Sequence, residues 1–208
     1  MHLGRQAGNV GRALAGLPLI GGWFARLIHR KTDSVHNKLD AERTPGILPA
    51  LVIMLFTLRV RGRFRRMLAL RRRGLIIITD RYPQMAVPRA YGGPNLVLGL
   101  RGNGLVRWLA RREQAVFRQM TRYRPDLVIR LSVDLETAYQ RKPDHRRDLL
   151  RANIEATPLL TFDGAPIVDI DATQPLDVVL AAARMAVANT LEAAGYAVQA
   201  PAGSGDRR

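Results

Sequence analysis

Three short runs of aliphatic and β-branched residues, each followed by polar residues, constrain the fold more than any other feature of the sequence. They occupy residues 75–79, 127–132 and 165–170. The first is apolar until its last residue, which is typical of a strand covered on both faces and therefore of a parallel sheet. Helical patterns alternate with the three runs. The sequence thus predicts an α/β fold of three layers, with a parallel sheet and flanking helices.

The longest helical pattern covers residues 47–73. Its first half is apolar all round, which predicts a helix buried on most of its sides. Its second half is amphipathic, with apolar residues at helical spacing and arginines between them. Pro49 suits the first turn, and Gly74 suits the position just beyond the last turn. The apolar positions of the second half are Val60, Phe64, Met67 and Leu68.

Shorter helical patterns follow at about 105–122, 134–141, 150–156 and 175–195. Asp134 is a natural N-cap, and Pro175 suits the first position of the last helix, whose apolar stripe predicts a buried face. Before residue 47 we expect loosely helical pieces. The whole reads as one domain over residues 1–200, with a lid-like segment at 141–151 and a disordered tail at 201–208.

Arginine dominates the charge of the chain. Lysines and arginines number 33 against 17 acidic residues, and the formal net charge is +16. Such an excess attracts phosphate, whether it belongs to a nucleotide, a nucleic acid or a membrane surface. The alternative is an arginine-rich composition that runs through the whole chain and serves no partner.

Composition also excludes several classes of protein. The chain has no cysteine, so disulfides, thiolate metal sites and a cysteine nucleophile are excluded, and a reducing, cytoplasmic compartment suits it. The longest apolar stretch, residues 47–58, has 12 residues, whereas a helix that spans a membrane needs roughly 20. The four histidines lack metal-ligand spacing, and no G-x-S-x-G motif is present. We therefore expect neither an integral membrane protein nor a serine hydrolase.

Charged residues follow the predicted strands, at the edge of the sheet where α/β proteins bind ligands. Asp80 and Arg81 follow the first strand, Asp134 the second, and Asp171 with Ala172 the third. A guanidinium can clamp two phosphate oxygens, and a carboxylate beside it can handle magnesium or the attacking group. Further positive charge is available from Arg141, Lys142, Arg146, Arg147 and Arg151. The sequence therefore permits phosphoryl transfer, and the alternative is an ordinary surface ion pair beside a solvated basic helix.

The order of these pieces resembles the thymidylate kinase family of P-loop kinases. In that family a helix with an acceptor-binding arginine is followed by a glycine and by a strand that ends in Asp-Arg. Here Arg59, Gly74 and the Asp80-Arg81 pair stand at those positions. The segment "RPDLVIRLSVDLETAYQRK" is similar to the family's strand and helix before its arginine-rich lid, and "IVDIDATQPLDVV" to its last strand beside the adenine. "AYGG" at 90–93 is similar to its "AYQG", and the resemblance covers residues 47–195.

The resemblance implies a nucleoside monophosphate kinase, which transfers a phosphoryl group from ATP, with Mg²⁺, to dTMP or a related acceptor. Asp80 would organise the Mg²⁺ through water, and Arg81 would bridge the phosphates. Nucleotides would be its substrates. The acceptor would be bound by Arg59, Leu55, Phe56 and Tyr91.

The resemblance also implies how the donor is held. Arg141, Arg146 and Arg147 would belong to a lid that closes over ATP, and Ala172 would lie near the adenine. Kinases of this type often pair through helices, so the helix at 47–73 could form a homodimer.

Three departures from the family matter. The chain contains no Gly-Lys pair, so the Walker A loop that wraps the donor phosphates is absent from this sequence. Leu55 stands where the family has the aromatic residue that stacks on thymine, with Phe56 one position later. The loop after Arg81 is longer and lacks the family's serine.

The first departure affects the predicted sheet, because the Walker A loop of the family follows its central strand. We therefore expect an N-terminally shortened P-loop kinase-like chain that lacks this first, central strand. An in-frame P-loop just upstream of the codon for Met1 would support that expectation.

Two other interpretations stay open. The chain could be a non-catalytic phosphate- or nucleotide-binding remnant of the fold, linked to polysaccharide synthesis. It could instead bind nucleic acid or an anionic membrane through the arginines of 59–73, although no interleaved aromatic residues there point to base stacking. ATP turnover separates the kinase from the remnant, and binding that falls steeply with salt would identify the third interpretation.

Overall fold

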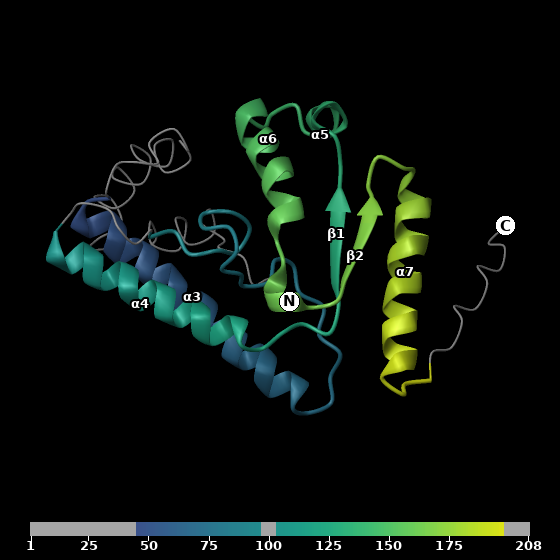
Figure 1. The fold of residues 1–208 in the computed structure, drawn as a ribbon, viewed down its shortest axis with the longest axis horizontal. Coiled ribbons are helices and arrows are strands. Elements are labelled where there is room, and N and C mark those ends of the chain that lie inside the picture. Colours follow the sequence, from purple (N-terminus) through teal and green to yellow (C-terminus); the bar gives the residue numbers. More distant parts are fainter. Residues whose placement is uncertain (1–44, 97–102, 198–208) are drawn as a thin grey trace, which may run out of the picture. The chain divides into compact units, whose positions relative to one another are not determined.

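The structure, a computed structural model, describes residues 45–96 and 103–197 (Figure 1). The predictions for residues 1–44 and for the tail at 201–208 lie outside the described residues. The chain divides into two compact units. Among the described residues, unit 1 comprises 45–96, 103–123 and 159–163, and unit 2 comprises 124–158 and 164–197. The single domain over 1–200 stays a prediction.

Unit 1 is built on the long helix α3, Ile47–Arg71. Pro49 lies in its first turn, where the missing backbone N–H costs nothing. The helix ends because Gly74 takes a φ of 79°, a left-handed conformation that residues with a Cβ seldom adopt. The predicted helix at 47–73 is therefore confirmed to within two residues.

One face of α3 packs, and the opposite face is exposed. Ala50, Thr57 and Val60 are buried on the packed face. On the other face Leu51 and Leu55 are 45% and 55% exposed, although the sequence predicted that the first half of the helix is buried on most of its sides. That prediction is wrong for the described residues, because α3 packs mainly against one other helix, α4.

The helix α4, Gly104–Thr121, begins at Asn103, whose side-chain oxygen accepts a hydrogen bond from the Leu105 amide at 2.8 Å. Its buried positions recur every three or four residues, so one face is apolar. The predicted helix at 105–122 is confirmed.

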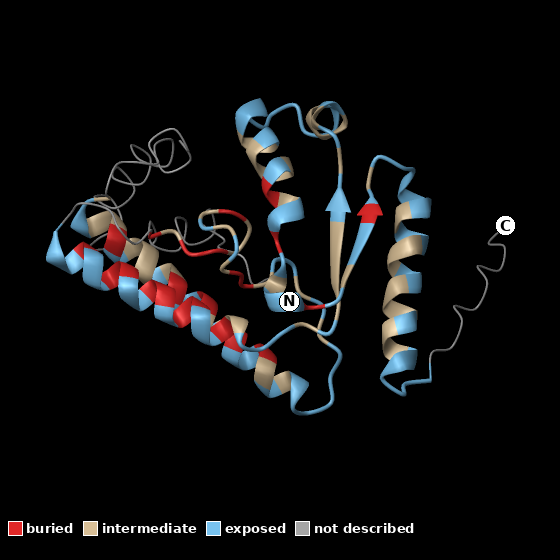
Figure 2. Ribbon diagram, viewed as in Figure 1, coloured by how far each residue is buried: buried red, intermediate tan, exposed pale blue. Residues whose placement is uncertain are grey.

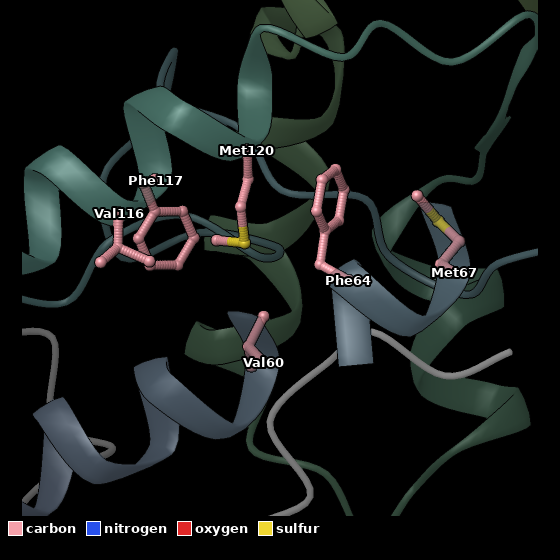
Figure 3. Close-up of a cluster of buried hydrophobic side chains, with 6 residues drawn as sticks. All are labelled: Val60, Phe64, Met67, Val116, Phe117 and Met120. Atoms are coloured by element: carbon pink, nitrogen blue, oxygen red, sulfur yellow. The ribbon is translucent and has the colours of Figure 1, made fainter. Parts of the chain in front are cut away.

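Two apolar clusters join α3 to α4. Towards the start of both helices, Ala50 lies among Val106, Leu109 and Ala110. Towards their ends, Phe64 and its neighbours on α3 meet Phe117 on α4 (Figure 3). Because the starts meet each other and the ends meet each other, the two helices run side by side in the same direction (Figure 1). The second cluster consists of Val60, Phe64, Met67, Val116, Phe117 and Met120.

Residues 75–79 do not form a strand, so the strand predicted there is wrong. Leu75, Ile76 and Ile78 are exposed, Ile78 by 77%. A strand is stable only where its backbone groups pair along their length with a neighbouring strand, and in this region only Asp80, directly after the segment, takes part in a bridge. An apolar, β-branched sequence alone does not supply that neighbour.

Unit 2 holds a parallel sheet of two strands, β1 (Val128–Ser132) and β2 (Ile167–Asp171). Val128 lies opposite Ile167, and Ser132 opposite Asp171. The strands predicted at 127–132 and 165–170 are confirmed with shifts of one or two residues. The described residues thus form an α/β structure with a small parallel sheet and flanking helices.

Three helices accompany this sheet. The crossover from β1 to β2 contains α5 (Leu135–Arg141) and α6 (Arg147–Ala156), and α7 (Leu176–Ala193) follows β2. Pro175 is the N-cap of α7, one position before the predicted one. No residue of α7 is fully buried, so its apolar stripe is less covered than the sequence predicted. Among the described residues, no helix has the length and apolar character needed to cross a membrane.

We predict that Phe64→Ala lowers the free energy of unfolding by about 3 to 5 kcal/mol, because Phe64 is 2% exposed and its loss leaves a cavity between α3 and α4. Urea unfolding followed by circular dichroism measures this change. The matched control on the same helix is Leu58→Ala, which removes an exposed side chain and should cost less than about 1 kcal/mol. Equal losses in the two variants would contradict the packing described here.

Candidate functional site

The Asp80-Arg81 pair lies on unit 1, at the start of the loop that follows residues 75–79. Both side chains are exposed. Arg81 has a φ of 60°, which is uncommon for a residue with a long side chain and marks local strain. Its guanidinium carbon lies 5.8 Å from the centre of the Tyr91 ring, within the range of a cation–π contact. The structure therefore brings together two residues that the sequence assigned to one site.

A buried glutamine gives this loop its shape. Gln84 is 1% exposed, and its side-chain amide donates to the carbonyls of Val87 and Ala90 at 2.7 and 3.1 Å. Its side-chain oxygen accepts a hydrogen bond from the Val87 amide at 2.9 Å. One side chain thus satisfies three backbone groups of a turn that has no regular secondary structure.

Two glycines allow the loop to fold back on itself. Gly92 has a φ of 78°, and a Cβ there would lie 2.7 Å from the Tyr82 carbonyl oxygen. A Cβ on Gly93 would lie 2.7 Å from the Gln84 side-chain nitrogen. The "AYGG" sequence is therefore a tight turn that sets the Tyr91 ring near Arg81.

The carboxylate of Glu113 fixes the far end of the loop to the helices. Glu113 is fully buried on α4 and accepts a hydrogen bond from the Thr57 hydroxyl of α3 at 3.0 Å. The backbone amides of Asn95 and Leu96 donate to the same carboxylate, at 3.1 and 2.6 Å. Charge-assisted hydrogen bonds of this kind are stronger than neutral ones. Both helices and the loop are thereby tied together at one side chain.

Near its start the loop is anchored by aromatic contacts. The Tyr82 hydroxyl donates to the Tyr123 carbonyl at 2.6 Å, just after the end of α4. The Tyr82 ring packs edge-on against Phe64, with 5.7 Å between the ring centres. Since Tyr82 directly follows Arg81, these contacts hold the position of the Asp80-Arg81 pair.

The predicted acceptor residues of α3 lie one helical turn apart. Leu55 and Arg59 are exposed, and Phe56 is half-buried. Partial burial, together with the positive charge of Arg59 one turn away, lowers the pKa of Arg63. Leu55 and Arg59 are four residues apart and therefore share one face of the helix.

In unit 2, polar residues cluster where β1 and β2 end. The Asp171 carboxylate accepts hydrogen bonds from the Thr173 hydroxyl at 2.7 Å and from the Thr173 amide at 2.8 Å. These bonds, with a further one from Gln174, lower the pKa of Asp171. Asp134 caps α5 as predicted, because its side chain accepts from the Thr137 amide at 2.8 Å.

Arg141 connects the end of α5 to the turn after β2. Its guanidinium donates to the carbonyls of Ala172 and Thr173. The two residues that the resemblance placed beside ATP, Arg141 and Ala172, are therefore in direct contact. Two donors are used to hold the guanidinium plane in place, and its flat faces remain as a surface on which an aromatic base could stack.

The other two predicted lid arginines are paired with acidic residues of unit 2. Arg146 forms an ion pair with Asp148. Arg147 forms one with Glu136 at 2.7 Å and also lies over the Tyr139 ring of α5, with 5.4 Å from its guanidinium carbon to the ring centre. The structure thus does not bring these two side chains to Arg141. Exposed pairs of this kind are worth little, so their partners can be exchanged for a ligand at small cost.

Sequence reasoning missed the residues that support the loop, chiefly Glu113 and Gln84. A signal for Glu113 existed, since it is the only acidic residue between Arg81 and Arg124 and falls on the apolar face of α4. A carboxylate in that position is rarely buried without a specific partner. Within the described ranges, no group of three or more histidine, aspartate or glutamate side chains could hold a metal ion.

Comparison with known proteins gives the chain its family. Neither a known family profile nor a solved structure matches it. It is 40% identical over 188 residues to "Uncharacterized ATP-binding protein YghS" of Escherichia coli strain K12, which covers 90% of this chain and 78% of that protein. It is 32% identical over 187 residues to "Uncharacterized ATP-binding protein YghR" of the same strain, which covers 89% of this chain and 73% of that protein.

The α/β protein described above therefore belongs to the family of YghS and YghR. YghR of Escherichia coli strain CFT073 matches with the same identity and coverage. The resemblance to the thymidylate kinase family stays a prediction, since no comparison reports it.

We predict that Glu113→Ala lowers the free energy of unfolding by about 3 kcal/mol or more, because it leaves buried donors of the loop and of Thr57 without an acceptor. Hydrogen exchange reports how the loop responds to the substitution. The backbone amides of Asn95 and Leu96 should lose their protection from exchange. Gln119→Ala on the exposed face of α4 removes a surface hydrogen bond to Arg61 and is the matched control, with an expected change below about 0.5 kcal/mol. A Glu113→Ala protein as stable as this control would refute the anchoring role.

We predict that Thr173→Val raises the pKa of Asp171 towards that of an ordinary aspartate, because the hydroxyl bond is the largest cause of its lowering. The folded pKa lies below the unfolded one, so this carboxylate stabilises the fold above the ordinary pKa and loses that effect as the pH falls through the folded value. Carboxyl-detected NMR titration gives the pKa directly. Gln174→Ala should raise it less, and no change in Thr173→Val would show that the hydroxyl does not act on Asp171.

Proposed function

We propose that the chain binds ATP and acts as a phosphotransferase towards a nucleoside monophosphate or a related phosphorylated acceptor. The observation that carries the proposal is the likeness, over nine-tenths of the chain, to two proteins that are both named as ATP-binding. The residues to which the thymidylate kinase resemblance points give the proposal its chemistry. Those residues lie on both units.

On unit 1 the phosphates would be handled by Arg81 and Asp80. A guanidinium offers two parallel donors to phosphate oxygens. An exposed guanidinium on a loop that is held in place needs little reorganisation to bind a phosphate. Arg81 meets this description, because Tyr82, Gln84 and Glu113 fix the loop on which it stands. Its strained backbone also fits a functional position, since such strain is usually kept where it serves a site.

The carboxylate of Asp80 fits a magnesium ion that is held mainly by phosphate and water. Mg²⁺ commonly takes one or two protein carboxylates and completes its shell with substrate oxygens and waters. An exposed carboxylate next to a phosphate-binding arginine could hold Mg²⁺ in this way. When bound, ATP and Mg²⁺ would supply the phosphoryl group and the charge that neutralises it in transfer. Asp80 would orient water on the metal side, and Arg81 would hold the phosphate oxygens.

On unit 2 the adenine would lie against Arg141 and the turn at Ala172. The guanidinium plane is fixed by the carbonyls of residues 172 and 173, so stacking on a base would require little loss of side-chain freedom. Arg146 and Arg147 would exchange their present acidic partners for the nucleotide's phosphates. On α3, Arg59 would contact the acceptor, with Leu55 and Phe56 beside it and Tyr91 next to Arg81. The non-catalytic nucleotide-binding alternative uses the same residues without transfer.

Nucleotide binding and phosphoryl transfer should be measured in the same preparations. We expect fluorescent mant-ATP to bind in the presence of Mg²⁺, and Arg81→Gln to weaken it about tenfold or more through the loss of a charge-assisted contact. Asp80→Asn should keep binding and lose transfer of labelled phosphate from ATP to a panel of nucleoside monophosphates. Arg184→Gln on α7, an exposed arginine that is not one of the proposed site residues, is the control and should behave as the unaltered chain.

The outcomes separate the interpretations. Binding with transfer that depends on Asp80 supports the phosphotransferase. Binding without transfer, in a chain that is folded by circular dichroism, supports the non-catalytic nucleotide-binding protein. An absence of binding to the folded chain would refute both.

A further inference from the structure

The positive charge of the chain is concentrated in unit 1. Its described residues contain fifteen arginines and three acidic residues, and one of those three, Glu113, is buried and bound inside the unit. The described residues of unit 2 contain eight basic and ten acidic residues. The excess of positive charge is therefore not spread evenly through the chain. An arginine-rich composition without a role would have spread it evenly.

One face of α3 is exposed, and Figure 2 shows pale blue exposed positions on this helix. This face carries both apolar and basic residues. Ile47, Leu51 and Leu58 are 41–46% exposed and follow each other at spacings of four and seven residues. Arg65 and Arg66 continue this exposed face towards the end of the helix. Spacing of this kind places all of them on one side of a helix.

The arginines of this face have no acidic partner in the part of the chain that the structure describes. Arg65 and Arg66 are exposed and form no ion pair with any described carboxylate. A helix face with uncovered leucines and uncompensated arginines is complementary to a surface that is both apolar and anionic.

We propose that this face of α3 binds the surface of an anionic lipid bilayer. The leucines enter the boundary between headgroups and acyl chains, and the arginines contact the lipid phosphates while their stems lie along the apolar layer. The helix lies in the plane of the interface and does not cross it. This inference goes beyond the proposed nucleotide site.

Two other occupants fit the face less well. Nucleic acid would use the arginines but would leave three aliphatic side chains exposed, and no row of aromatic residues accompanies them for base stacking. A second copy in parallel register would place Arg65 and Arg66 against their own equivalents. In the antiparallel register it would press those charges onto leucines, and both arrangements are unfavourable.

Insertion of this face can be tested with a single fluorescent label, because the chain has no cysteine of its own. Leu51→Cys carries an environment-sensitive NBD label on the proposed face, and Leu176→Cys, at a residue 72% exposed on α7, carries it on unit 2 as the control. We expect a blue shift and an increase in NBD fluorescence at position 51 with vesicles of equal parts phosphatidylcholine and phosphatidylglycerol. Phosphatidylcholine vesicles should give no such change, and position 176 should not respond to either.

Flotation of the full chain with the same vesicles tests the two kinds of side chain separately. Both Leu51→Ser/Leu58→Ser and Arg65→Gln/Arg66→Gln should lower vesicle binding about tenfold, since apolar insertion and charge act together. The unit 2 pair Arg124→Gln/Arg184→Gln removes the same charge and should leave binding within about twofold. None of these positions belongs to the proposed nucleotide site.

Three results would overturn the proposal. One is vesicle binding that is unchanged by the leucine substitutions. Another is a short single-stranded RNA that binds through Arg65 and Arg66, with no binding to anionic vesicles. The third is a dimer in sedimentation velocity that dissociates in Leu51→Ser/Leu58→Ser, with an NBD signal at position 51 that vesicles do not alter.

Discussion

The buried carboxylate of Glu113 is the interaction on which the described part of unit 1 depends. It joins the hydroxyl of Thr57 on α3 to the backbone of residues 95 and 96, and it stands on α4 itself. A buried charge is tolerated only where such donors surround it. This carboxylate fixes the far end of the loop that begins at Asp80. Glu113, although distant in sequence, therefore helps to hold Arg81 and Tyr91 in position.

The two units differ in how their charged residues are arranged. Unit 1 carries the excess of arginine, the strained Arg81 and the exposed face of α3, whereas unit 2 carries a parallel sheet whose charged residues are largely paired with one another. Arg130 of β1 illustrates this, since it forms two hydrogen bonds of 2.7 Å with Asp169 of β2 and thereby lowers the pKa of that carboxyl. The described residues of unit 1 thus carry a net positive charge, which favours the anionic partners proposed above.

Sequence patterns predicted the local elements well and the tertiary environment poorly. The helices at 47–71 and 104–121, the cap at Asp134 and both strands of unit 2 follow from spacing and capping, which act over a few residues. Residues 75–79 have an equally strong strand pattern, yet a strand also needs a neighbour, and that depends on the rest of the fold. For the same reason the leucines of α3 were expected to be buried, and the roles of Glu113 and Gln84, which depend on contacts distant in sequence or on loop shape, were missed.

Photolabelling tests most directly the proposal that a nucleotide binds with its base against Arg141 and Ala172. The folded chain would be irradiated with 8-azido-ATP and Mg²⁺, with and without excess ATP, and the labelled peptides identified by mass spectrometry. If the base lies there, the label is expected in peptides from the end of α5 and from the turn after β2. Excess ATP should then prevent this labelling. Label confined to other segments, or label that ATP does not displace, would contradict it.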